Sequence, residues 1–376
     1  MPVSPAEVLG ALRREPDVEA PDLVAVDATD RLLLDIAADL VAGCGGGEVA
    51  VVDDSYGALA LGLAARHGLT GLRVSQDLLV GERALAANAE RVGLAGSFRS
   101  LPLGEELAAG ARVVLVKAPK ALDALREIAE VVAASAAPDV TVLVGGRVKH
   151  MTHAMNDVLG ASFGEVQATL ARQKSRVLVA RGPRPRPSSF PRQHVHPDLG
   201  LTVCAHGAAF AGTKIDIGTR ALVRSLPEMA ADARSALDLG CGTGVLATLL
   251  ARSRPELRVL AVDQSAAAVA SAAATAAANG VADRVVALRD DAAATVPDRS
   301  VDLVVCNPPF HVGAAVVTTA ADRMFAAAAR LLRPGGELWT VYNSALRYRP
   351  VLGRVVGPTR VAGQDPKFTV AVSRRR

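Results

Sequence analysis

The hydrophobic positions in the second half of the chain fall into short apolar runs, separated by segments of helical length. These runs are Ser235–Leu239, Arg258–Val262, Arg284–Arg289 and Val301–Cys306. An alanine-rich helix is expected between the second and third runs, because it closes at Asn279-Gly280, a typical helix stop. Strands that alternate with helices at this spacing form βαβ units, so the pattern predicts a mainly parallel, doubly wound sheet.

The first half of the chain shows the same order of apolar runs. Strands are predicted over Glu48–Val52, Leu72–Ser75 and Arg112–Val116. Between the halves, the segment Arg181–Arg192 is rich in proline, which excludes a helix interior and favours an extended connection. We therefore predict two α/β domains of similar size, residues 1–190 and 191–376.

The composition agrees with this architecture and sets the broad class of protein. Aromatic residues make up only 3% of the chain although 50% is hydrophobic, so alanine, valine and leucine must build the cores, as in helices packed on parallel strands. A net charge of +4 permits a polyanionic partner without requiring one. The four cysteines form no CxxC pair, and no apolar run is long enough to cross a membrane. A soluble, cytoplasmic monomer without disulfides or a signal peptide is expected.

A glycine loop follows the first of the strands predicted in the second half. Gly240, Gly242 and Gly244 stand between a strand and a helix, where backbone amides can approach a ligand closely. Asp263 ends the next strand, where a carboxylate can accept both ribose hydroxyls. A dinucleotide fingerprint needs a third glycine at position 245, which is valine here, so the tighter loop favours S-adenosylmethionine. A simple strand-to-helix turn is the alternative.

The most specific motif is Asn307-Pro308-Pro309-Phe310 at a strand end. The Asn307 side-chain carbonyl and the Pro308 backbone carbonyl can each accept a hydrogen of a planar amine. That arrangement directs the nitrogen lone pair at a neighbouring methyl group, and the prolines keep the acceptors rigid. Phe310 offers a stacking face for an extruded base, whereas His311 is expected to be structural or to contact the substrate rather than act as a base.

Together, Asp238-Leu-Gly-Cys-Gly-Thr-Gly244 and Asn307-Pro-Pro-Phe-His311 resemble the class I methyltransferases. Within that class the chain resembles the RsmC/RlmG family of ribosomal RNA guanine-N(2) methyltransferases, and the segments Phe210–Arg220 and Tyr342–Tyr348 support the match. The resemblance covers essentially the whole chain. It implies two tandem Rossmann-like methyltransferase domains, the N-terminal one degenerate. It also implies S-adenosylmethionine as cofactor, and methyl transfer to the exocyclic amine of a guanosine in ribosomal RNA or a ribosomal subunit.

On this basis we assign candidate residues to three roles and expect no metal site. The catalytic candidates are Asn307, Pro308, Pro309 and Phe310. The cofactor candidates are Asp238, Gly240, Cys241, Gly242, Gly244, Asp263, Asn307 and, for the adenine amine, Asp290 or Asp291. The substrate candidates are Phe310, His311, Lys214 and Arg220. The resemblance implies that Phe210–Arg220 lies over the cofactor and that Asn307–Phe310 hold the guanine.

The N-terminal domain is expected to bind no S-adenosylmethionine. Asp53 and Ser55 stand at the positions of Gly240 and Gly242, Ser75 at that of Asp263, and Lys117 at that of Asn307. We expect this domain to dock RNA or to assist folding of the other, with a purely structural partner as the alternative. Candidate RNA contacts are Lys117, Lys120, Arg147, Lys149 and the basic residues between 166 and 197, a stretch without acidic residues. They are Arg172, Lys174, Arg176, Arg181, Arg184, Arg186 and Arg192.

Other functions stay open at this point. DNA adenine and protein glutamine methyltransferases use a similar loop, more often with tyrosine as its aromatic residue. A non-catalytic RNA-binding factor with a vestigial fold is a third possibility. His150 and His153 lack further ligands for a metal, His194 and His196 are expected at the surface, and Cys306 is expected to be an inert buried thiol.

Overall fold

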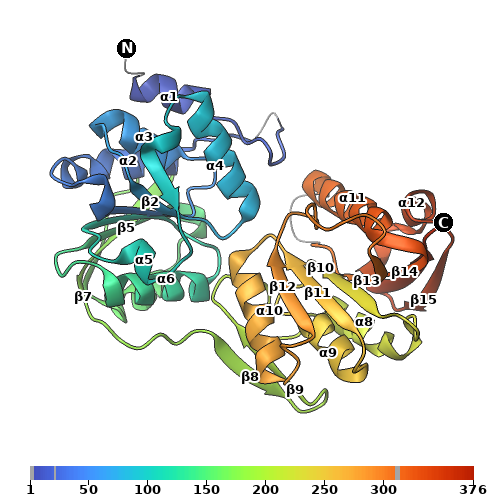
Figure 1. Ribbon diagram of the computed structural model, residues 1–376. Coiled ribbons are helices and arrows are strands. Elements are labelled where there is room, and N and C mark those ends of the chain that lie inside the picture. The colour runs from blue at the N-terminus through green and yellow to red at the C-terminus, as the bar shows by residue number, and fades with distance from the viewer. Residues whose placement is uncertain (1–3, 21–22, 310–313) are drawn as a thin grey trace. The chain divides into compact units, whose positions relative to one another are not determined.

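The computed structural model describes residues 4–20, 23–309 and 314–376 (Figure 1). The chain divides into two compact units, Met1–Phe190 and Pro191–Arg376, which we call unit 1 and unit 2. Each unit contains a seven-stranded sheet with helices on both faces (Figure 1). This arrangement confirms the fold class predicted from the apolar runs.

The sheet of unit 1 has the strand order β3-β2-β1-β4-β5-β7-β6, in which only β7 runs antiparallel to its neighbours. Helices α1 to α4 pack on one face and α5 to α7 on the other. The strands are β1 (Val49–Val52), β2 (Leu72–Ser75), β3 (Phe98–Ser100), β4 (Val113–Lys117), β5 (Thr141–Arg147), β6 (Phe163–Ala168) and β7 (Ser175–Pro183). The helices are α1 (Pro5–Ala11), α2 (Ala28–Val41), α3 (Ala58–His67), α4 (Leu79–Arg91), α5 (Glu105–Ala108), α6 (Leu122–Ser135) and α7 (His153–Gly160), with 3-10 turns η1 (Gly46–Glu48), η2 (Ala95–Ser97) and η3 (Val148–His150).

The sheet of unit 2 repeats this topology in the order β12-β11-β10-β13-β14-β16-β15. Helices α8 to α10 cover one face, and α11 and α12 the other. The strands are β10 (Ser235–Leu239), β11 (Arg258–Asp263), β12 (Val285–Arg289), β13 (Val301–Cys306), β14 (Leu332–Asn343), β15 (Thr359–Gln364) and β16 (Phe368–Arg374). The helices are α8 (Ile217–Arg224), α9 (Val245–Ser253), α10 (Ala266–Ala278), α11 (Ala314–Leu331) and α12 (Arg349–Val355), with 3-10 turns η4 (Leu226–Glu228) and η5 (Ser344–Leu346).

The central strands are apolar on both faces because helices cover both sides of each sheet. In β13, Leu303 and Val305 face the core under α8 to α10, while Val304 and Cys306 face the core under α11 and α12. Parallel strands buried in this way read as continuous apolar runs, which explains why the sequence pattern located them.

A separate hairpin, β8 (Arg192–His196) and β9 (Leu201–Ala205), lies outside the large sheet of unit 2. Polar side chains on the otherwise alanine-rich helix α10 and at its C-cap, Asn279, hold the backbone of β9 and its continuation. Ser271 accepts from the amide of His206 (2.8 Å), Thr275 bonds both the amide and the carbonyl of Cys204 (3.0 and 3.2 Å), and Asn279 bonds both groups of Thr202 (3.0 and 2.7 Å). These bonds fix the start of the segment that leads from β9 to α8.

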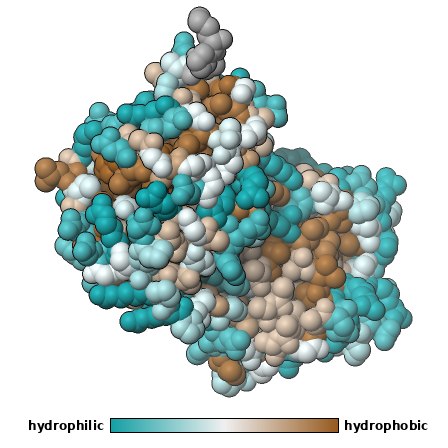
Figure 2. All heavy atoms as spheres, turned by 60° about the vertical axis from the view of Figure 1, so that its left-hand side comes forward, coloured by the Kyte–Doolittle hydropathy of each residue, from teal (hydrophilic) through white to brown (hydrophobic). Residues whose placement is uncertain are grey.

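The surface of the molecule mixes polar and apolar residues. Figure 2 shows both kinds interspersed over the visible face. Among the described residues, no helix combines the length and the apolar character that a membrane span requires.

Candidate functional site

The glycine loop forms the turn from β10 into α9, as predicted. Gly240, Gly242 and Gly244 all have positive φ angles, of 76°, 52° and 74°. The Gly240 and Cys241 amides donate to the carbonyl of Val262, at 2.8 and 3.0 Å. The loop is thereby tied to the end of the neighbouring strand β11.

The three glycines face different surroundings. A Cβ on Gly244 would lie 2.8 Å from the Cα of Ala272, so this position permits α10 to pack against the loop. A Cβ on Gly240 would lie 2.9 Å from the Met324 methyl group. A Cβ on Gly242 would meet no described atom within 4 Å, so this side of the loop faces open space.

Asp238 lies inside the protein beneath this loop. The residue is 1% exposed, and its carboxylate accepts a hydrogen bond from the Ala247 amide (3.0 Å) in the first turn of α9. Burial, and then the charge of Asp263, raise the pKa of Asp238 to about 7. The observed contact of Asp238 is therefore with the helix that follows the loop.

Asp263 ends β11 and lies directly against the glycine loop. One carboxylate oxygen accepts from the Gly242 amide and the other from the Ser265 amide, both at 3.0 Å. The carboxylate is thereby oriented by backbone groups on both sides, one of them in the loop itself. Asp263 is thus held against the glycine loop, through Gly242, at the carboxyl end of the sheet.

The two acidic candidates after β12 have different environments. Asp290 is buried, and its carboxylate accepts from the amide and hydroxyl of Thr295 (2.7 and 2.8 Å) and from the amide of Asp291 (2.8 Å). Asp291 forms an ion pair with Arg323 of α11 (2.6 Å). Asp290 therefore stabilises the turn after β12, whereas Asp291 connects that turn to α11.

Asn307 follows β13 at the same edge of the sheet. Its side-chain nitrogen donates to the Asp216 carboxylate (3.2 Å) and the Thr219 hydroxyl (3.0 Å), both at the start of α8. Its Oδ1 is buried and has no hydrogen-bond partner among the described residues. A buried acceptor without a partner is uncommon in folded proteins and is itself a pointer to a ligand.

The rest of the motif is only partly described. Pro308 is buried and Pro309 is exposed, whereas Phe310 and His311 lie outside the described residues. Cys306, just before Asn307, is fully buried, and burial together with the Asp238 charge raises the pKa of its thiol far above the usual range. The expectation that Cys306 is a buried thiol is confirmed.

The segment between β9 and α8 contains the two basic substrate candidates. Lys214 is exposed, whereas Arg220 is ion-paired with Asp198 at 2.6 Å. His196, expected at the surface, is instead buried, and its Nε2 lies 2.8 Å from the carbonyl of Thr213. That contact ties the β8–β9 hairpin to this segment.

Sequence reasoning missed the residues that hold Asn307. Asp216 is the N-cap of α8, where its carboxylate accepts from the Gly218 amide (2.9 Å), and Thr219 lies in the first turn. An aspartate before an amphipathic run is a usual helix-start signal, so the cap could have been predicted. Its contact with Asn307, 91 residues away, could not be predicted from one sequence.

Unit 1 keeps the shape of the loop although two of the three glycines are replaced; Gly57, with a φ angle of 88°, remains at the position of Gly244. Asp53 and Ser55 have positive φ angles of 59° and 48°, close to those of Gly240 and Gly242. The Ser55 amide donates to the side chain of Gln76 at 2.9 Å, as the Gly242 amide does to Asp263. The expected equivalence of Ser75 with Asp263 is therefore wrong by one residue. Ser75 pairs with β1 as Val262 pairs with β10, and Gln76 is the true counterpart.

Lys117 of unit 1 occupies the position equivalent to Asn307. Its ammonium group lies 3.1 Å from Asp27 and 2.5 Å from Asp30, at the N-terminus of α2. The choice of Lys117 as an RNA contact therefore needs correction, because these two carboxylates hold its charge inside unit 1. Lys120, Lys149 and Lys174 are exposed.

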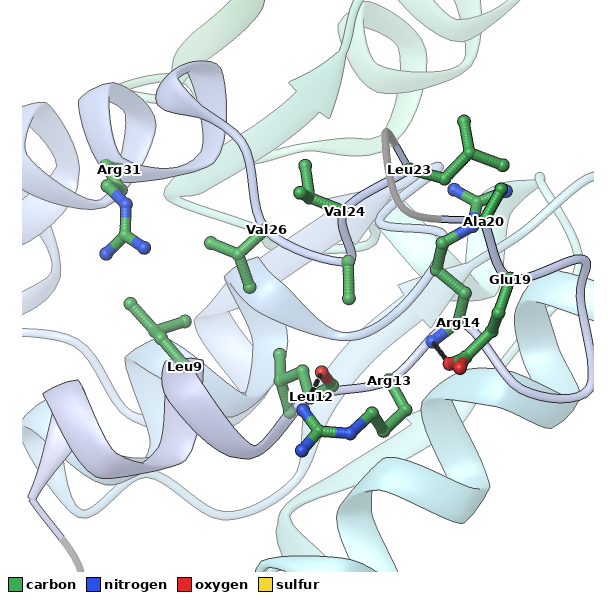
Figure 3. A pocket seen from close by; sticks show the side chains of 11 residues that line it. Leu9, Leu12, Arg13, Arg14, Glu19, Ala20, Leu23, Val24, Val26 and Arg31 are labelled. Carbon is green, nitrogen blue, oxygen red and sulfur yellow. Dashed lines mark hydrogen bonds between the residues drawn. The ribbon is translucent and has the colours of Figure 1, made fainter.

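Unit 1 also contains a pocket of about 480 Å³ between α1 and the segment before α2 (Figure 3). Its lining combines aliphatic side chains, such as Leu9 and Val26, with Arg13 and Arg31. The described residues that line it all belong to unit 1.

Comparison with known proteins covers both units. Residues 5–184 match the sequence family described as "RLMG N-terminal domain", and residues 200–372 match "Methyltransferase small domain". Among solved structures, the T. thermophilus 16S rRNA N2 G1207 methyltransferase RsmC, in complex with AdoMet and guanosine, matches with a TM-score of 0.72 and 25% identity. The match covers 93% of this chain and 92% of the other.

Curated relatives match over almost the full length of the chain. The ribosomal RNA large subunit methyltransferase G of Pseudomonas aeruginosa strain UCBPP-PA14 is 37% identical over 365 residues, covering 96% of each chain. The protein of the same name from Streptomyces coelicolor is 38% identical over 370 residues, again covering 96% of each. The resemblance seen in the sequence is confirmed, and the chain belongs to the ribosomal RNA large subunit methyltransferase G family.

Proposed function

We propose that this protein transfers a methyl group from S-adenosylmethionine to the exocyclic amine of a guanosine in large-subunit ribosomal RNA. The names of its relatives support the RNA, and the AdoMet and guanosine bound to RsmC support the cofactor and the base. The observation that carries the proposal is the Asn307 side chain, whose two amide hydrogens are used within the protein while its oxygen lacks a partner among the described residues.

The chain fits S-adenosylmethionine at the glycine loop. Open space beside Gly242 leaves room for a ligand, and Asp263 is held there by the loop amide. Both carboxylate oxygens of Asp290 accept hydrogen bonds within the turn after β12, whereas Asp291 bonds Arg323 through one oxygen only, so Asp291 is the better candidate for the adenine amine. When bound, the cofactor supplies an electrophilic methyl group on a sulfonium. Asp238 contributes indirectly, because its hydrogen bond with the Ala247 amide anchors the start of α9, the helix that follows the loop.

The chemical task of the protein is to orient a poor nucleophile. The lone pair of an exocyclic base amine is delocalised into the ring, so the amine must be held with that lone pair directed at the methyl group. The Asn307 Oδ1 and the Pro308 carbonyl accept the two amine hydrogens and leave the lone pair free. Because Pro308 is buried and fixed in conformation, the acceptors need little reorganisation. Contacts of Phe310 and His311 with the base remain predictions.

Unit 1 is proposed to dock the RNA rather than to bind cofactor. Side chains on Asp53 and Ser55 stand where the active loop has glycine, and Lys117 has no acceptor to offer an amine. The exposed Lys149 and Lys174 lie on adjoining segments, because the Val148 amide donates to the Lys174 carbonyl (2.9 Å). We propose this pair, with Arg147 beside it, as phosphate contacts. The protein is further proposed to act as a cytoplasmic monomer.

Changing Lys149 and Lys174 to alanine in the full chain tests this docking role. A plot of log affinity for ribosomal RNA against log salt concentration has a negative slope. We expect its magnitude to decrease by about 1.5, since each lost phosphate contact removes roughly 0.7–0.9. An unchanged slope would assign unit 1 a purely structural role.

Methyl transfer to separated ribosomal RNAs and subunits tests the main proposal. With radiolabelled cofactor and nucleoside mass spectrometry, we expect one singly methylated guanosine from the large subunit, absent for Asn307→Ala. Methyl on DNA adenine or protein glutamine would favour those classes instead. Failure to bind S-adenosylmethionine in calorimetry would identify a non-catalytic RNA-binding factor.

A further inference from the structure

Two residues at the start of helix α8 hold the side-chain amide of Asn307 by hydrogen bonds. Asp216 and Thr219 each accept one of its two hydrogens, at 3.2 and 3.0 Å. Asp216 is itself fixed, because it caps α8 by accepting from the Gly218 amide and its carbonyl accepts from the Arg220 amide, both at 2.9 Å. The direction of the Asn307 side chain is therefore set by a helix terminus rather than by its own strand.

The carboxylate decides which way the amide faces. An ionised carboxylate can only accept hydrogen bonds, so the Asn307 nitrogen must be the amide atom that contacts Asp216, and the oxygen takes the other position of the amide. A threonine hydroxyl can donate or accept, so Thr219 alone would tolerate either orientation. Asp216 is thus the group that forbids the flipped amide, which would present a donor in place of an acceptor.

Gly218 makes this close contact possible. A Cβ at this position would lie 3.0 Å from the Asn307 oxygen and 3.0 Å from the Asp216 carboxylate. Its φ angle is not in the left-handed region, so backbone conformation does not account for glycine here. The close approach of α8 to the side chain after β13 does account for it.

Unit 1 contains the same arrangement with a different occupant. Asp27 caps α2, and with Asp30, three residues later, it holds Lys117 at the end of the equivalent strand. In both units, therefore, a cap aspartate and the residue three positions later bind the side chain at the carboxyl end of the fourth strand. In unit 1 that side chain is an ammonium without an acceptor, and in unit 2 it is an amide that retains one.

We propose that Asp216 is a positioning residue that keeps the Asn307 oxygen directed at the group that receives the methyl. Because that oxygen can only accept a hydrogen bond, the group that receives the methyl must carry an N–H hydrogen. This inference rests on the proposed function, since it assigns a role to Asp216 through Asn307. Asp216 reaches the reacting amine only through that amide.

The test is Asp216→Asn in the full-length protein. Asparagine is also a good helix cap, so α8 is expected to stay folded, but its amide can donate and allows the Asn307 side chain to flip. We expect kcat to fall by about 10²-fold, the usual effect of losing one preorganised transition-state hydrogen bond. The dissociation constant for S-adenosylmethionine, measured by calorimetry, should change less than about twofold.

The matched control is Asp302→Asn. Asp302 lies at the opposite end of β13, where its carboxylate accepts from the amides of Arg234 and Ser235 at 3.0 Å. This variant makes the same chemical change on the strand that precedes Asn307. It should lower the melting temperature without the loss of kcat.

Comparison with Asn307→Ala separates the possible outcomes. Because that variant is expected to be inactive, the positioning role is measured in Asp216→Asn itself, as a loss of kcat at normal melting temperature and normal cofactor affinity. A loss of kcat that tracks melting temperature or cofactor affinity would overturn the positioning role. Full activity of Asp216→Asn beside an inactive Asn307→Ala would also overturn it while leaving the proposed function intact. An active Asn307→Ala would instead refute the proposed function itself.

Discussion

Replacing Gly242 by serine should separate the stability of the glycine loop from its ligand affinity. Unit 1 has a serine at the equivalent position, Ser55, whose φ angle of 48° is close to the 52° of Gly242. The backbone can therefore accept a side chain there. A non-glycine residue in the left-handed region costs roughly 1–2 kcal/mol, so we expect Gly242→Ser to lower the free energy of unfolding by about 1 kcal/mol.

The effect on the cofactor should be larger than this. A Cβ on Gly242 meets no described protein atom within 4 Å, so the serine side chain would enter the space assigned to S-adenosylmethionine. We expect the dissociation constant to rise at least about tenfold, equivalent to about 1.4 kcal/mol of binding free energy. Isothermal titration calorimetry measures the affinity, and urea denaturation of the unliganded protein measures the stability.

The matched control for this variant is Gly280→Ser. Gly280 follows α10 with a φ angle of 70°, and a Cβ there also meets no described atom within 4 Å. It should lose similar stability and keep normal affinity. Normal affinity in Gly242→Ser would show that the open side of the loop is not cofactor space.

Three further changes test other parts of the structure. Lys117→Met leaves two carboxylates at the start of α2, one of them buried, without their cation and should cost about 2 kcal/mol in urea denaturation. A loss below about 0.5 kcal/mol would contradict a stabilising role for this partly buried ion cluster. Burial raises the pKa of Asp238 to about 7, so the folded state binds the proton of this carboxyl group more tightly than the unfolded chain does. The free energy of unfolding should therefore fall as pH rises from about 4 to about 7. Asp238→Asn should flatten that fall in denaturation at about pH 5 and about pH 8; an unchanged profile would place the titration elsewhere. Thr275→Val leaves the amide and carbonyl of Cys204 without their partner and should cost about 1–3 kcal/mol, so an unchanged melting temperature would refute the role given to this contact.

The buried central strands could be predicted closely from the sequence. The predicted ranges Ser235–Leu239 and Val301–Cys306 coincide with β10 and β13, because strands covered on both faces are apolar throughout. The antiparallel strands could not be located in this way. In β6 the side chains of Phe163–Ala168 are mostly exposed, so the strand has little apolar pattern to detect.

The candidate site was predictable where its residues follow strands, and less so elsewhere. The glycine loop and Asn307 were located because each comes directly after an apolar run. The counterpart of Asp263 in unit 1 was misplaced by one residue, because the chemistry there is an amide side chain, Gln76, rather than a carboxylate. The hydrogen bond between Asp216 and Asn307 depends on where α8 lies relative to the end of β13, which only the folded structure reveals.

The pairing of α10 with β9 has a consequence for how this chain can change length. Four residues along a helix advance about 6.0 Å, and two residues along a strand about 6.6 Å, so three contacts stay in register with a mismatch of only about 1 Å. One residue inserted among Ser271, Thr275 and Asn279 would turn the later side chains by about 100° away from the strand. Insertions and deletions in this region must therefore fall outside the two paired segments.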